Sequence, residues 1–362
     1  MKDQQEYKEF TRAIIRLSRY TVFIAIIAVA CIIVLVISLF TGRVPVSPAT
    51  PALVINTNTS TQSPASAVIH KASISSSNTW SPPDDSTIPK GNNGRMIRYG
   101  RELIAHTADY FGPRGSIAHL ANGMNCQNCH LDGGTKTYAN NFAGVTANYP
   151  KFSPRSGKVA SAALRIAECF ERSLAGKVPD TAGHEVQAML AYITWLGRGV
   201  KKESKLFGNA SEKIPFMDHA ADPLKGHNVF VAKCQSCHGK NGEGLLSAGK
   251  ASYTYPPLWG KDSYNDGAGM YRIGNFAGFV KNNMPNGATY QRPQLSNEEA
   301  WDVAAFVNSQ PRPHKDQRRD WPKINKKPID FPFGPYEDKY AQTQHKFGPF
   351  KPIQNSQKLL EK

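Results

Sequence analysis

The sequence predicts a mostly α-helical protein in which two modules of similar layout follow one another behind a single N-terminal transmembrane helix. The pattern Cys-x-x-Cys-His occurs twice, at 126–130 and at 234–238, and a helix-like segment precedes each copy. Each module also ends in a segment with aromatic and aliphatic residues at spacings of three and four, which indicates a helix with one buried face. Gly- and Pro-rich stretches separate these segments, so we expect long loops between the helices.

The N-terminal segment 21–40 is a run of 20 residues without a charge, and about 20 apolar residues are needed to cross a bilayer as a helix. Five basic residues precede it: Lys2, Lys8, Arg12, Arg16 and Arg19. The positive-inside rule then places residues 1–20 in the cytoplasm and the rest of the chain in the periplasm. A cleaved secretory signal is the alternative, but its apolar region is usually shorter, about 7–15 residues. We therefore expect a single-pass anchor in a bacterial inner membrane.

Four further segments follow the anchor. Residues 41–90 are rich in Ser, Thr and Pro without apolar periodicity, which predicts a flexible linker. The two modules are expected at 91–215 and 216–312, and the segment 313–362, rich in Pro, Lys and aromatic residues, is expected to wrap the surface as an irregular tail.

The net charge of +16 suits small anionic substrates or anionic lipid. The sequence has no arginine-rich arm, recognition-helix pattern or aromatic-basic platform, so we expect no nucleic-acid partner.

Four helices frame the two modules in this interpretation. The first module should contain one over 96–110 and a terminal one that packs through Met189 to Trp195. The second should contain one over 224–233 and a terminal one capped by Ser296, with two glutamates in its first turn. A serine at this position and acidic residues after it both stabilise the start of a helix.

The repeated pattern is typical of covalent haem c attachment. Its two thiols form thioethers to the haem, and the adjacent histidine is held against the iron. The residues are Cys126, Cys129 and His130 in the first module and Cys234, Cys237 and His238 in the second. A zinc knuckle or a redox dithiol is the alternative, but a dithiol needs no histidine and the chain lacks a thioredoxin-like pattern. We therefore expect two covalently bound haem c groups.

The identity of the sixth iron ligand is a main determinant of haem potential. In the second module the best candidate is Met284, which lies in the loop-like stretch 282–287. Met270 is the rival, although its surroundings resemble the start of a helix and suit core packing. Ligation by histidine and methionine raises the potential, which suits a haem that passes electrons onward.

The first module has no methionine between His130 and Met189, and Met189 belongs to the packing face of the terminal helix. The remaining candidates for the sixth ligand are Cys169 and a second imidazole, His184. An inert, buried cysteine is the third possibility, and spacing alone leaves all three open.

Cys169 is expected in a helix that begins near 156–157. Residues four apart share a helix face, so Arg165 and Ser173 should flank the thiol. A neighbouring arginine favours the thiolate, which is the form that ligates metals and attacks sulfur.

Residues 91–352 resemble the dihaem thiosulfate dehydrogenases, a family that also includes tetrathionate reductases. The resemblance rests on the first attachment site, on Arg-Ser-Gly-Lys-Val-Ala-Ser at 155–161, Cys-Phe-Glu-Arg-Ser at 169–173, Asn-Met-Pro at 283–285, Glu-Ala-Trp-Asp-Val-Ala-Ala-Phe at 299–306, and tail motifs at 321–322, 327–330 and 333–336. The element at 169–173 is the specific one, since paired attachment sites alone fit many cytochromes.

The resemblance implies a role for each candidate residue. The active-site haem would have His130 and Cys169 as its axial ligands, with substrate bound beside the cysteine. The substrate-binding arginines would be Arg155 and Arg165, with Ser173 nearby. The second haem would relay electrons and be ligated by His238 and Met284. Some members carry a lysine beside this methionine that competes for the iron; here Asn283 takes that position, so a ligand switch is not expected.

The implied reaction joins two thiosulfate dianions into tetrathionate. Like charges repel strongly in a pocket of low dielectric constant, so a pair of arginines that bind sulfonate oxygens is required. A thiolate can bond transiently to sulfur, as in thiol–disulfide exchange. Electrons would pass from haem 1 to haem 2 and on to a periplasmic or membrane cytochrome.

Two other functions compete with this one. A non-catalytic electron-transfer cytochrome predicts that Cys169 only packs. A different haem–thiolate sulfur enzyme would need a partner subunit with a sulfur-carrying cysteine.

Overall fold

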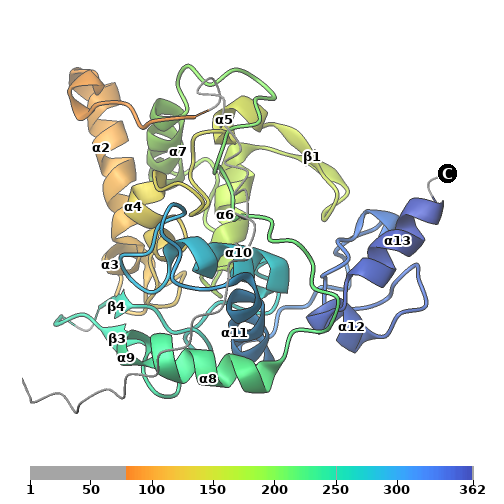
Figure 1. Cartoon of the computed structure of the whole chain (residues 1–362). Coiled ribbons are helices and arrows are strands. Elements are labelled where there is room, and N and C mark those ends of the chain that lie inside the picture. Colours follow the sequence, from red (N-terminus) through yellow and green to blue (C-terminus); the bar gives the residue numbers. More distant parts are fainter. Residues whose placement is uncertain (1–78, 250, 361–362) are drawn as a thin grey trace, which may run out of the picture. The chain divides into compact units, whose positions relative to one another are not determined.

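The computed structural model describes residues 79–249 and 251–360, which all fall within one compact unit (Figure 1). No helix in these two ranges is long and apolar enough to cross a membrane. The predicted anchor at 21–40 and most of the predicted linker lie outside the described residues. The last residues of that linker pack on the first module, where Ile88 is buried in the core.

The first module is built from six α-helices and one small hairpin. They are α2 (Gly91–Ala105), α3 (Thr107–Phe111), α4 (Leu131–Gly134), α5 (Val145–Asn148), β1 (Lys151–Ser153), β2 (Lys158–Ala160), α6 (Ala162–Arg172) and α7 (His184–Leu196). Two short 3-10 helices, η2 (Asp85–Thr87) and η3 (Cys126–Asn128), complete the module. The segment predicted as one helix over 96–110 is two helices that meet at His106.

The second module repeats this layout with fewer elements. They are α8 (Pro223–Lys233), α9 (Gln235–His238), β3 (Leu245–Leu246), β4 (Tyr253–Tyr255), the 3-10 helix η4 (Gly269–Tyr271), α10 (Ile273–Asn283) and α11 (Asn297–Ser309). The predicted cap of α11 is confirmed, because Ser296 Oγ accepts a hydrogen bond from the backbone N–H of Glu299. Within the described residues the strands form two antiparallel pairs, β1–β2 and β3–β4. The predicted class of two tandem, mostly helical modules is therefore confirmed.

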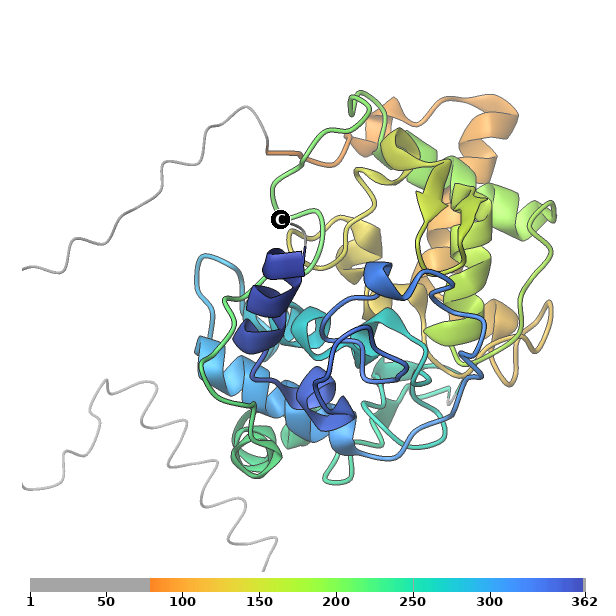
Figure 2. The same ribbon diagram turned by 90° about the vertical axis from the view of Figure 1, so that its right-hand side faces the viewer.

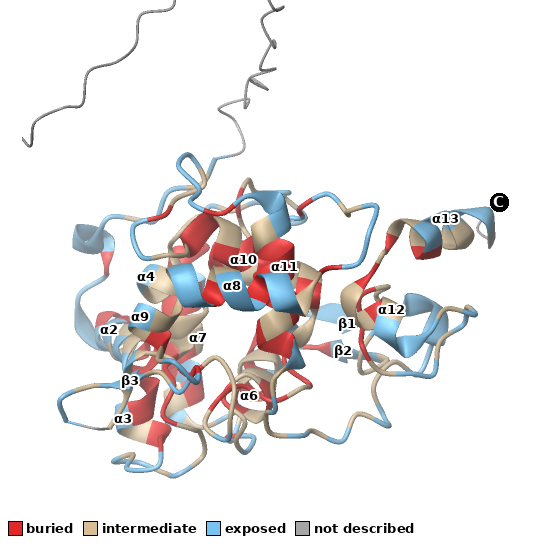
Figure 3. Ribbon diagram, turned by 60° about the horizontal axis from the view of Figure 1, so that its bottom comes forward, coloured by how far each residue is buried: buried red, intermediate tan, exposed pale blue. Residues whose placement is uncertain are grey.

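A glycine lets the first and last helices of each module approach closely. In the first module α2 packs on α7, and a Cβ atom on Gly100 would lie 1.9 Å from the carbonyl oxygen of Ala188. In the second module α8 packs on α11, and a Cβ atom on Gly226 would lie 1.9 Å from the carbonyl oxygen of Asp302. Only glycine fits such a backbone approach. The same contact thus recurs in both modules, with buried faces turned inward and exposed faces outward (Figure 3).

Two local predictions were wrong. The helix that carries Cys169 begins at Ala162, where Ser161 caps it, and not near 156–157. Residues 154–157 instead form the turn of the β1–β2 hairpin, in which Gly157 adopts a φ of +68°. The tail is irregular only in part: after the 3-10 helix η5 (Ile324–Lys326) it ends in α12 (Gln342–Phe347) and α13 (Lys351–Leu360).

Candidate haem and substrate sites

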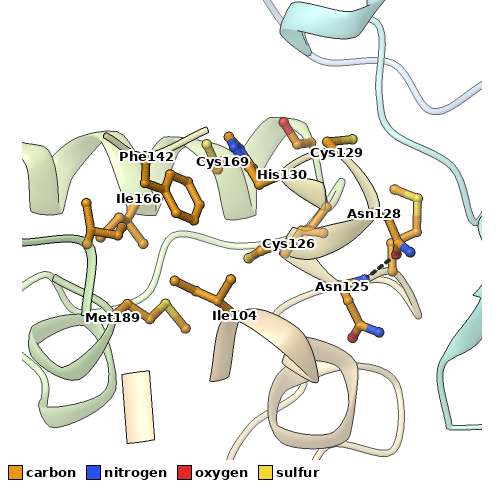
Figure 4. A pocket seen from close by; sticks show the side chains of 14 residues that line it. Ile104, Asn125, Cys126, Asn128, Cys129, His130, Phe142, Ile166, Cys169 and Met189 are labelled. Atoms are coloured by element: carbon orange, nitrogen blue, oxygen red, sulfur yellow. Dashed lines mark hydrogen bonds between the residues drawn. The ribbon is translucent and has the colours of Figure 1, made fainter. Parts of the chain in front are cut away.

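The first cavity lies between the first attachment motif, α6 and α7. It is lined by Cys126, Cys129 and His130 together with Ile104, Phe142, Ile166, Cys169, Ser173, Met189 and Ile193, among others (Figure 4). This lining is mostly apolar, as is usual for cofactor sites. Met189, which the sequence placed in the helix-packing face, also lines this cavity.

The His130 ring is fixed by two contacts. Its Nδ1–H donates to the backbone carbonyl of Asn140 over 2.5 Å, and the ring stacks on Phe142 at 4.5 Å between centroids. A histidine that ligates a metal nearly always donates its other ring N–H to such an acceptor. The contact leaves Nε2 available as a ligand.

Cys169 lies next to His130 in this cavity (Figure 4). It is carried by α6, and His130 is one of the groups that lower the pKa of its thiol. The rival candidate His184 is exposed and stacks on Tyr99 at 5.5 Å instead, and it does not line the cavity. Of the two candidates from the sequence, only Cys169 therefore faces His130.

The charges around Cys169 favour its thiolate. Burial opposes ionisation, but the positive charge of Arg165 and the hydrogen bond from His130 outweigh it and lower the pKa of the thiol to about 7. The thiol in turn raises the pKa of Arg165. A thiolate at neutral pH is the form that ligates iron and attacks sulfur.

Arg155 and Arg165 come together on one carboxylate. Arg155 is in the hairpin turn, and its Nη2 lies 2.5 Å from Oε2 of Glu168, while Arg165 Nη1 lies 3.5 Å from the same oxygen. Burial lowers the pKa of Arg155, and the charges of Arg172 and Arg165 lower it further. Two guanidinium groups and one carboxylate give this cluster a net positive charge.

Sequence reasoning missed two residues of this cluster. Glu168 follows Arg165 by three positions on α6, a spacing that places both on one helix face, so the sequence did hold a signal for it. Tyr149 hydrogen-bonds to Arg165, but it precedes the hairpin and no local pattern marks it.

The second cavity contains Cys234, Cys237 and His238. The Nδ1–H of His238 donates to the backbone carbonyl of Pro256 over 2.8 Å, which repeats the arrangement of His130. Both Met284 and Met270 line this cavity. Both methionine candidates from the sequence therefore reach the same space.

The two cavities share a wall. Met124, Asn128 and Cys129 line both of them. Groups bound in the two cavities are therefore close neighbours, and the first attachment motif itself lies between them.

Asn283 links the ligand loop of the second module to the first. Its side chain is 2% exposed, and Nδ2 donates to the carbonyls of Tyr138, over 3.1 Å, and Phe279, over 2.9 Å. Its amide nitrogen is therefore engaged by two backbone carbonyls, while the buried Oδ1 has no hydrogen-bond partner among the described residues.

Comparisons with known proteins identify the two modules. Residues 117–201 match the SoxA/TsdA cytochrome c domain, and residues 224–311 match the cytochrome c domain. The thiosulfate dehydrogenase of Stutzerimonas stutzeri is 37% identical over 234 residues, which are 65% of this chain and 73% of that protein. The chain belongs to the thiosulfate dehydrogenase family.

Two further relatives of this family agree. The thiosulfate dehydrogenase of Allochromatium vinosum is 38% identical over 235 residues, covering 64% of this chain and 83% of the relative. The structure of the thiosulfate dehydrogenase (TsdBA) from Marichromatium purpuratum in its "as isolated" form superposes with a TM-score of 0.61 at 34% identity. That match covers 66% of this chain and half of the Marichromatium chain.

The residues present in this family member fit haem c in both modules. Each cavity holds two cysteines beside a histidine whose Nδ1 is already hydrogen-bonded to a backbone carbonyl. Together with the two cytochrome c domain matches, this confirms the prediction of two covalently bound haem c groups.

Proposed function

We propose that this chain oxidises thiosulfate and joins two thiosulfate ions into tetrathionate with release of two electrons. One observation carries the proposal: the Cys169 side chain lines the first cavity with His130, and the positive charges of Arg165 and Arg155 act on its thiol to lower the pKa. A plain electron-transfer cytochrome needs no such cationic cluster next to a thiolate. Membership of the thiosulfate dehydrogenase family supports the same reaction.

The proposal assigns one haem to each module. In the catalytic domain, 91–215, Cys126 and Cys129 would hold the haem, with His130 and Cys169 as ligands. In the relay domain, 216–312, Cys234 and Cys237 would hold it, with His238 and Met284 as ligands. The described part of the tail, 313–360, contacts both domains, through Asp320 on Arg172 and Lys315 on Asp266. When bound, the haems would supply two one-electron acceptors between the substrate and a periplasmic or membrane cytochrome.

The arginines bring the two anions together. Each thiosulfate carries two negative charges, and their repulsion is strong at short range in a poorly solvated pocket. Arg155 and Arg165 offset that repulsion and bind sulfonate oxygens through pairs of N–H donors. Glu168 holds both side chains in place before substrate arrives, and the hydroxyl of Ser173, which lines the same cavity, supplies a further hydrogen bond.

Cys169 forms and then gives up a sulfur–sulfur bond. Its thiolate bonds to the sulfane sulfur of the first thiosulfate, which leaves a cysteine S-thiosulfonate adduct (Cys–S–S–SO3⁻) of charge −1 and releases two electrons, for which the two haems would be the acceptors. The second thiosulfate then attacks the sulfane sulfur of that adduct, as in thiol–disulfide exchange. Tetrathionate leaves, and the thiolate is regenerated.

Each residue named in these reaction steps would act in the same way when the reaction runs in reverse. Tetrathionate reduction is therefore part of the proposal. The common wall of the two cavities supports electron passage between the haems without a further carrier. A stopped-flow assay of the holoprotein with thiosulfate, and of its reduced form with tetrathionate, tests the reaction.

We also propose that residues 21–40 anchor the chain in the inner membrane with both haem domains in the periplasm. The support is the uncharged run behind a basic N-terminus and the need of cytochrome c domains for haem attachment outside the cytoplasm. Sedimentation of the full chain with washed membranes, against release of a chain that starts at residue 79, tests the anchor.

Met284 is expected to be the sixth ligand of the second haem. Met284→Leu should remove the sulfur-to-iron charge-transfer band of that haem and lower its potential, because thioether ligation raises potential. Met270→Leu, at a residue in the same cavity, is the matched control and should keep the band. Loss of the band in the Met270 variant alone would reverse the assignment.

A further inference from the structure

The loop that carries Arg155 lies in an isolated hairpin. Strands β1 and β2 pair only with each other, and their opposed residues Phe152 and Val159 are 53% and 67% exposed. A two-stranded hairpin is marginally stable by itself. Its turn therefore needs other contacts if it is to hold an arginine at a fixed place.

Those contacts come from residues 313–322 of the tail, here called the strap, which lies beside the hairpin (Figures 1 and 2). The backbone N–H of Trp321 donates to the carbonyl of Arg155 over 2.7 Å. Pro322 covers Gly157, where a Cβ atom would lie 2.6 Å from Pro322 Cγ. Trp321 itself has a φ of +61°, a region that side chains such as tryptophan rarely adopt.

The strap is also tied to the helix that carries Cys169. The carboxylate of Asp320 accepts two hydrogen bonds from Arg172 near the end of α6, at 2.7 and 2.8 Å. Both side chains are almost fully buried, at 9% and 11% exposure. Paired, buried bonds between a guanidinium and a carboxylate fix geometry as well as energy.

The other end of the strap is held by the second module. Asp266, in the loop between β4 and η4, accepts hydrogen bonds from the backbone N–H of Lys315, over 2.8 Å, and from the Gln317 side chain, over 3.2 Å. The strap therefore runs from the second module across α6 to the hairpin turn.

We propose that the strap is a positioning element for substrate binding: through Asp320 and the backbone of Trp321 it fixes the turn that carries Arg155 relative to Cys169. Glu168 holds the guanidinium of Arg155, and the strap holds its backbone, so the side chain is fixed at both ends. The inference rests on the proposed function for its kinetic consequence, but the contact itself is open to a separate measurement.

The first test compares two aspartates of the strap. Asp320→Asn should raise KM for thiosulfate about tenfold with kcat within about twofold, because the turn is loosened while Cys169 and the haems are untouched. Asp316→Asn is the matched control, since Asp316 pairs with Arg318 on the exposed surface, and it should match the wild type. Asp320→Glu, which restores the carboxylate, should recover part of the affinity. A wild-type KM in Asp320→Asn overturns the proposal.

A double-mutant cycle shows whether the strap acts through Arg155. In an Arg155→Gln background, Asp320→Asn should add less than about twofold to KM, because the side chain that it positions is already gone. The full effect in that background overturns the proposal. Gly157→Ala displaces Pro322 while leaving the pair of Asp320 and Arg172 intact, so it should raise KM in the same way. It replaces Asp320→Asn as the test if that variant does not fold.

Hydrogen exchange provides a readout independent of activity. Amides of 151–160 should exchange faster in Asp320→Asn holoprotein than in Asp316→Asn, with unchanged protection in α7. Equal exchange rates in the two variants would overturn the proposed role of the strap. Failure of the wild type to oxidise thiosulfate would instead overturn the proposed function and leave this comparison valid.

Discussion

Cys169→Gly is expected to abolish thiosulfate turnover while both haems remain attached. The substitution removes the sulfur that lies next to His130 and that we propose bonds to substrate, so the rate should fall by at least about a thousandfold. Cys126 and Cys129, which carry the thioethers, are untouched. Steady-state kinetics should be measured together with the ratio of covalent haem to protein.

His184→Gln is the matched control for this variant, because His184 is the other ligand candidate from the sequence and stacks on Tyr99 outside the cavity. It should keep wild-type activity. Near-normal turnover in Cys169→Gly would remove Cys169 from the reaction and contradict the proposed mechanism.

Arg155→Ala and Arg165→Ala are each expected to raise KM for thiosulfate by about 10–100-fold, the equivalent of a charge-assisted hydrogen bond of about 1.5–3 kcal/mol. Arg155 should have the larger effect, because it is 18% exposed against 39% for Arg165. Its loss also leaves the carboxylate of Glu168 with its more distant partner only, and that charge repels the substrate. Initial rates over a range of thiosulfate concentrations measure the effect.

Two comparisons sharpen the arginine prediction. Arg165→Lys keeps the charge but loses the paired donors, so its KM should lie between those of the wild type and of Arg165→Ala. Arg198→Ala, on the exposed surface just beyond α7, should leave KM unchanged. An unaltered KM in both alanine variants at the active site would contradict a cationic clamp.

Local sequence signals predicted much of the helical framework. Ser296 with the glutamates after it marks the start of α11, and the apolar spacing from Met189 to Trp195 marks α7, because capping and packing faces are encoded within a few neighbouring residues. The hairpin at 151–160 escaped prediction. Its strands are three residues long and largely exposed, so no alternating apolar pattern marks them.

Some features of the site could likewise be predicted from the sequence, and others could not. The spacing of Arg165 and Cys169 on one helix was readable, since it depends on helix geometry alone. The carbonyl of Asn140 that orients His130, and the wall that the two cavities share through Met124, depend on how loops distant in sequence pack. Arg155 was indicated by family resemblance, and its place beside Glu168 depends on the hairpin and on a tail more than 150 residues away.

The most direct test of the account is the stoichiometry of haem reduction by thiosulfate. Oxidised full-length holoprotein, purified from membranes, is mixed with thiosulfate under anaerobic conditions, haem absorbance is followed, and tetrathionate is quantified. The account predicts reduction of both haems with one tetrathionate formed per two electrons, and reoxidation of reduced protein by tetrathionate through the same site. Haems that dithionite reduces but that neither thiosulfate nor tetrathionate affects would contradict it.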